Sequence, residues 1–74
     1  MPVIDMQATG MNIRNIIHDK GFKIADVQAR CGFHTPQAIF KWLRGESVPS
    51  IDNLVILADM FGVTIDQIIV VTKI

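Results

Sequence analysis

The sequence predicts a single all-α domain with five helices over residues 10–69, an N-terminal arm over residues 1–9 and a short apolar tail over residues 70–74. Five segments carry apolar residues three and four positions apart, the spacing that places them on one face of a helix. Each segment is bounded by residues that begin or end helices. A chain of 74 residues that is 50% hydrophobic is large enough for one modest core.

The first helix is expected over residues 10–20, with Thr9 as its N-cap and Gly21 as its stop. Its predicted inner stripe is Ile13, Ile16 and Ile17.

The next two helices are expected over residues 23–31 and 36–44. Gly32 suits the left-handed conformation that ends the first of them. Thr35 is the expected cap of the second, and Pro36 suits its first position because the missing N–H needs no partner there. Two short helices joined in this way form a helix-turn-helix, whose second helix would enter a DNA major groove.

The fourth helix is expected to begin after Ser50 and to run to Phe61, with Gly62 as its stop. Thr64 caps a fifth helix, and the tail that follows is β-branched and suited to an extended conformation. The predicted buried residues of the fourth helix are Leu54, Leu57, Ala58 and Phe61, and the fifth helix carries Ile65, Ile68 and Ile69.

Charge is unevenly distributed along a chain whose net charge is zero. Residues 14–44 hold six basic residues against two acidic ones, a net +4, whereas residues 45–74 have a net −3. This asymmetry fits a domain with one side toward DNA and one side away from it, although scatter of fourteen charges is the alternative explanation.

Several function classes find no support in the sequence. A single cysteine excludes a disulfide framework and suits a reducing cytoplasm, and no segment resembles a membrane span or a signal peptide. Cys31 and His34 form a C-x-x-H pair, but a structural zinc needs four ligands and only His18 remains as a usual donor. No nucleophile has a credible base partner, so we expect no enzyme, no metal, no cofactor and no small-molecule ligand.

The outward side of the helix over residues 36–44 carries the candidates for base contact. Gln37 can bond bidentately to adenine or to a phosphate, and Lys41 can reach guanine or a phosphate. Phe40 either packs against a thymine methyl or folds under the turn beside Phe33. The full set of expected DNA contacts is Lys23, His34, Thr35, Gln37, Ala38, Phe40, Lys41 and Arg44.

Several of these residues also have a simpler explanation. Thr35 is fully explained as a helix cap, and Lys23 and Arg44 are expected phosphate ligands for which a solvated surface is the alternative. Trp42 falls on the apolar stripe with Ile39, so we expect it in the core and not on the DNA side.

Residues 11–69 resemble the DNA-binding domains of the lambda repressor and Cro type, the XRE family of bacterial and phage regulators. The residues that carry the resemblance are the Gly21 to Gly32 spacing, the segment IFKWLRG over residues 39–45, Pro49, Leu54, Leu57, Ala58, Phe61, Gly62, Val63 and Asp66. The resemblance implies binding to duplex DNA, usually as a dimer on a near-palindromic operator.

Two departures from the family pattern concern the helix-turn-helix itself. The turn is one residue longer than usual between Gly32 and Ile39, which moves the start of the second helix. Ile24 occupies a place where many members have a phosphate-binding Gln, and Lys23 is the candidate to replace it.

Two further departures lie outside the motif. Glu46 stands in a loop that is often basic and would be repelled by phosphates. Ile17 and Leu43 replace a basic and acidic pair that commonly joins the first and third helices, an exchange that affects stability and not function.

The apolar tail is the expected contact between two copies of the chain. A β-branched segment with unpaired backbone groups can pair across a two-fold axis, and the alternative is that the tail folds back onto its own first helix. The expected homodimer contacts are Met60, Ile68, Val70, Val71 and Ile74.

A protein-interaction module or antitoxin-type partner is the alternative to a DNA-binding regulator. Zero net charge, Glu46 and Ile24 fit this alternative, as does a surplus of apolar residues. These residues are Val3, Ile4, Met6, Val55, Ile56, Met60, Val70 and Val71.

Overall fold

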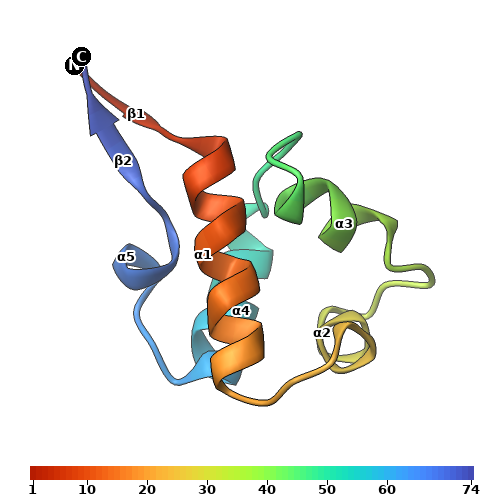
Figure 1. The fold of residues 1–74 in the computed structure, drawn as a ribbon. Coiled ribbons are helices and arrows are strands. Elements are labelled where there is room, and N and C mark those ends of the chain that lie inside the picture. The colour runs from red at the N-terminus through yellow and green to blue at the C-terminus, as the bar shows by residue number, and fades with distance from the viewer.

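The computed structural model, which describes all of residues 1–74, contains the five predicted helices (Figure 1). The elements along the chain are β1 (Pro2–Ile4), α1 (Met6–Asp19), α2 (Ile24–Cys31), α3 (Gln37–Leu43), α4 (Ile51–Phe61), α5 (Ile65–Ile68) and β2 (Val71–Lys73). The first helix contacts α3 and α5, while α2 packs against α4.

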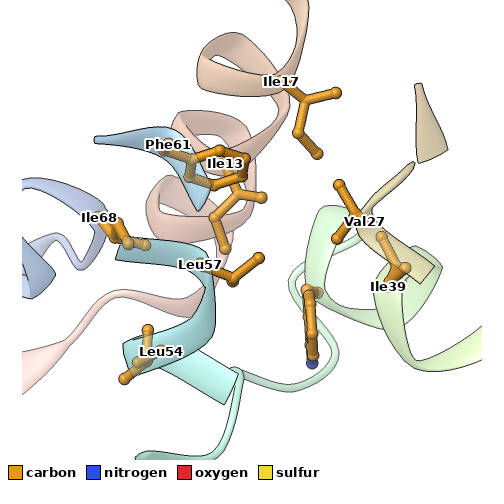
Figure 2. Close-up of a cluster of buried hydrophobic side chains, with 9 residues drawn as sticks. Ile13, Ile17, Val27, Ile39, Leu54, Leu57, Phe61 and Ile68 are labelled. Carbon is orange, nitrogen blue, oxygen red and sulfur yellow. The ribbon is translucent and has the colours of Figure 1, made fainter. Parts of the chain in front are cut away.

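One cluster of buried side chains receives a contribution from every helix (Figure 2). The predicted apolar stripes supply it, and Trp42 is 3% exposed, which confirms its place in the core. The cluster consists of Ile13, Ile17, Val27, Ile39, Trp42, Leu54, Leu57, Phe61 and Ile68. Helices too short to be stable alone are thereby fixed through shared burial.

The predicted start of α1 is wrong by four residues. The helix begins at Met6, and Asp5 is its N-cap, with a side-chain oxygen that accepts from the Ala8 N–H at 2.9 Å. Thr9, the expected cap, is buried inside the helix, where its Oγ1 accepts from the Val70 N–H at 2.9 Å. The expected N-terminal arm is therefore a short strand followed by the first turn of α1.

A close approach of α1 and α3 explains why the first helix contains a glycine. A Cβ added at Gly10 would lie 2.1 Å from the Trp42 carbonyl oxygen, far inside van der Waals contact. Only glycine lets the two backbones approach to this distance, and α3 depends on that approach for its position.

The remaining helix ends follow the sequence closely. Ser50 caps α4 by accepting from the Asn53 N–H at 3.2 Å, and Thr64 caps α5 by accepting from the Gln67 N–H at 3.3 Å. Gly62 ends α4 in the left-handed region with a φ of 70°. The fifth helix is one residue shorter than predicted, because Ile69 is extended at its C-cap.

A two-stranded antiparallel sheet joins the ends of the chain and was not predicted. β1 pairs with β2 in the register Pro2↔Lys73, Val3↔Thr72 and Ile4↔Val71. The tail is extended, as its β-branched residues indicate, and it returns to its own chain at one edge. The ribbon projects from the helical body, with both termini at its tip (Figure 1). None of the helices is long and apolar enough to span a membrane.

Candidate nucleic-acid interface

The turn between α2 and α3 is held by backbone bonds. Gly32 ends α2 with a φ of 73° in the left-handed region, as predicted. The Phe33 N–H then donates to the Gln28 carbonyl at 3.0 Å, and the Gln28 amide donates back to the Phe33 carbonyl at 3.3 Å. This reciprocal pair fixes the direction in which the chain leaves α2 and so sets the path into α3.

The predicted start of α3 is wrong by one residue. The helix begins at Gln37, because the Pro36 carbonyl accepts the first helical bond, from the Phe40 N–H at 3.1 Å. Pro36 is thus the N-cap residue, and no side chain caps the helix. The expectation that Thr35 caps α3 is wrong, since the longer turn leaves its exposed hydroxyl outside the first helical turn.

Two buried residues anchor α3 to the body of the protein. Ile39 is fully buried and Trp42 nearly so, and the Phe33 ring meets the Trp42 ring edge-on with centroids 5.8 Å apart. Phe33 therefore fills the space under the turn, whereas Phe40 is 40% exposed on the other side of the helix. Of the two positions considered for Phe40, the structure shows the outward one.

The outward side of α3 presents polar side chains that make no hydrogen bond within the chain. Gln37 and Lys41 are both exposed and lie one turn apart, so they share a face of the helix. Neither takes part in a side-chain hydrogen bond within the chain. Ala38 is half-buried and packs against the core.

Arg44 is already engaged by a neighbour. Its Nε donates to a carboxylate oxygen of Glu46, and both side chains remain about half-exposed. The hydrogen bond to Arg44 holds the pKa of Glu46 below its ordinary value, and the same bond raises the pKa of Arg44. Both groups are consequently charged at neutral pH, and Glu46 competes with any phosphate for the guanidinium.

Basic side chains extend from α2 onto α1. Lys23 lies at the start of α2, where its N–H donates to Asp26 at 2.8 Å and leaves the ammonium exposed. Together with Arg14 and His18 it lines a groove of about 300 Å³. Arg14 is not among the predicted contacts, although its spacing of four residues from His18 places the two on one face of α1. The groove is also lined by Ile17, Phe22, Ile24 and Leu43.

Other basic and polar residues near the motif have different settings. Arg30, at the end of α2, faces α4, where its guanidinium lies 3.8 Å from the Asp59 carboxylate. His34 and Thr35 are exposed in the turn before α3.

No three His, Cys, Asp or Glu side chains cluster in a way that could hold a metal ion. Burial raises the pKa of the Cys31 thiol.

The residues expected between two copies of the chain do not share one surface, and one of them, Val70, is half-buried with its N–H donated to Thr9. Ile68 is fully buried in the core, so its expected place at a surface contact is wrong. Met60 is half-buried in a groove between α4 and α2, where it lies with Phe22 and not with the tail. Val71 and Ile74, by contrast, are 48% and 85% exposed on the ribbon.

The apolar side of α3 is fixed in the core, its outer side carries free polar groups, and basic side chains lie nearby. This arrangement is that of a helix-turn-helix DNA-binding domain. A family model described as helix-turn-helix matches residues 13–68 of the chain. The protein belongs to this family, the XRE type that includes lambda repressor and Cro. Its members are DNA-binding regulators and are not typically enzymes. A search of curated proteins and a search of solved structures found no match.

Proposed function

We propose that the protein is a repressor that binds an operator in duplex DNA as a dimer, with α3 in the major groove. The observation that carries this proposal is the two-sided character of α3. Ile39 and Trp42 fix one side in the core, while Gln37 and Lys41 on the other side are exposed and make no side-chain hydrogen bond or salt bridge within the chain. Side chains held on a rigid element and left unpaired are suited to bonding base edges.

Each candidate has a role that its chemistry supports. Gln37 reads adenine, Lys41 reads guanine or holds a phosphate, and Phe40 contacts a thymine methyl. Ala38 contributes a small apolar contact beside them. The DNA phosphates on either side of the major groove are held by Lys23, Arg14, His34 and Thr35. Arg44 joins them once its guanidinium leaves Glu46.

A dimer follows from the small number of base contacts. Two or three side chains that contact bases from a single α3 discriminate weakly between DNA sequences, because each good base contact supplies only about 1–3 kcal/mol. Two copies bound to half-sites about one helical turn apart double the number of base-contacting side chains. Occupying such an operator is sufficient for repression.

Titration of duplex DNA of random sequence at several salt concentrations tests DNA binding itself. Binding that weakens steeply as salt rises is expected, since each phosphate contact releases counterions. Absence of binding at low salt would contradict the proposal.

One observation favours a protein partner as the second candidate function. Ile51 and Val55 are 77% and 55% exposed on α4 and lie four residues apart, so they form an apolar stripe on its surface. An antitoxin would use such a stripe to hold another protein and α3 to hold DNA. Replacing both residues with Ser would abolish that interaction and leave salt-dependent DNA binding unchanged.

A further inference from the structure

The ribbon formed by β1 and β2 leaves specific backbone groups unpaired. Met1 and Ile74 exchange backbone hydrogen bonds, and the Asp5 N–H donates to the Val70 carbonyl at 2.8 Å. Bonded pairs alternate along an antiparallel ladder, so Val3↔Thr72 is the bonded pair between these two. The pairs Pro2↔Lys73 and Ile4↔Val71 are therefore non-bonded, and their N–H and C=O groups point outward.

The two outward edges of the ribbon differ in what they offer. On the β1 edge, Pro2 has no N–H, so Ile4 supplies the only donor. On the β2 edge, Val71 and Lys73 each present one donor and one acceptor. Only the β2 edge has both a backbone donor and a backbone acceptor at each of its outward residues.

We propose that β2 pairs antiparallel with β2 of a second copy, with Thr72 on the two-fold axis. In this register Val71 of each copy lies opposite Lys73 of the other, and all four outward groups of each strand are bonded. A register centred on Val71 would place Lys73 opposite Ile69, which lies outside β2. The result is a four-stranded sheet in the order β1, β2, β2, β1.

The side chains agree with this register. The two Thr72 side chains become neighbours across the axis, and Thr–Thr pairs are favourable between strands. Ile74, which is 85% exposed, comes to lie opposite Val70 of the second copy. Lys73 faces Val71 and not another Lys73, so its charge does not oppose pairing and its stem covers the valine. Two-stranded sheets are marginal in water, and pairing doubles the number of strands.

This inference rests on the proposed function in one respect only, since a dimer is what two half-sites require. Its tests measure the association of the protein without DNA. A protein that dimerises through β2 but binds no DNA would contradict the proposed function and leave the inference intact.

Cysteine cross-linking tests the register directly. In a Cys31→Ser background, Thr72→Cys is expected to form a disulfide-linked dimer under mild oxidation, because non-bonded partners across antiparallel strands lie about 4.5 Å apart at Cα, within disulfide reach. Val71→Cys is the matched variant, and it is expected to remain uncross-linked because its opposite residue is Lys73. Cross-linking of the Val71 variant in preference, or of neither variant, would overturn the proposed register.

Proline substitution tests the edge. Val71→Pro removes an outward N–H of β2 while leaving every bond to β1 in place, and Ile4→Pro does the same on the β1 edge. Light scattering is expected to give half the parent mass for Val71→Pro and the parent mass for Ile4→Pro, with unchanged circular dichroism in both. An undiminished mass for Val71→Pro, or a parent that is monomeric at high concentration, would refute pairing through β2. Deleting residues 70–74 is a poorer test, because it also removes the partner of β1.

Discussion

At the scale of single residues, the proposed function gives base recognition to two side chains on α3. Gln37 and Lys41 are exposed and make no side-chain hydrogen bond or salt bridge within the chain, so replacing either with Ala should leave folding unaffected. Each change is expected to weaken operator binding by about 1–3 kcal/mol and to relax base preference at one position, as for other base contacts. Titration against an operator and its single-base variants measures both effects. Undiminished affinity and preference in both variants would exclude α3 as the reader.

The bond between Arg44 and Glu46 is the second residue-scale feature with a measurable consequence. Glu46→Gln should free the guanidinium for a phosphate and remove a repelled charge, so affinity should rise for all sequences and the salt dependence should steepen by about one contact. The hydrogen bond to Arg44 depresses the pKa of Glu46 in the folded protein. As pH falls, the ion pair therefore outlasts the ordinary carboxylate pKa and is lost only when pH falls through the depressed pKa. A salt titration of both proteins at neutral pH is the measurement. Equal affinities would show that Arg44 does not face DNA.

At the scale of elements, the position of α3 depends on its close packing against α1. Alanine in a helix interior is ordinarily better than glycine by about 1 kcal/mol, but at Gly10 its Cβ would meet the Trp42 carbonyl. Gly10→Ala is therefore expected to destabilise the fold by about 1–3 kcal/mol, as overpacking does, and to weaken DNA binding by displacing α3. Met11→Ala, at a residue 58% exposed, is the control and should change the free energy of unfolding little. A Gly10→Ala variant that is more stable than the parent in denaturant titrations would mean that the two helices lie further apart.

The junction between α1 and the tail depends on one hydroxyl. Thr9→Val keeps the shape of the buried side chain but removes the acceptor of the Val70 N–H, which should cost about 1–3 kcal/mol of stability. Faster hydrogen exchange of the Val70 amide is the sharper measurement, because it reports the freed group itself. Unchanged exchange at that amide would show that the bond does not form in solution.

Elements defined by local signals could be predicted, and those defined by distant contacts could not. Gly32, Ser50 and Thr64 act on the residues beside them, so their helix ends follow from the sequence. Thr9 carries the same local signal as Ser50, yet it lies inside a helix because its partner is Val70, at the other end of the chain. The sheet does not follow from local signals for the same reason, since its two strands are the first and last segments.

The candidate site divides in the same way. The 3.6-residue period separates Trp42 from Lys41, so the core side and the outer side of α3 follow from the sequence. The period does not reveal that Arg44 bonds Glu46, or that Arg14 shares a groove with Lys23, because both depend on how loops and helices meet.

At the scale of the whole molecule, the charge asymmetry and the ribbon belong to one arrangement. The basic half of the chain contains α2 and α3, while the acidic half contains α4 and α5 and leads into β2. A dimer joined through β2 would keep α3 of each copy free for its own half-site. Affinity for a full operator should then fall much more than affinity for random DNA when the dimer is disrupted by Val71→Pro.

Selection of bound duplexes from a random pool tests the central claim most directly. The parent protein should enrich a near-palindromic sequence with half-sites centred about 10 base pairs apart, and Lys41→Ala should lose preference at one symmetry-related pair of positions and retain the rest. A pool without enrichment, or an enriched sequence that Lys41→Ala and Gln37→Ala read unchanged, would contradict operator recognition by α3.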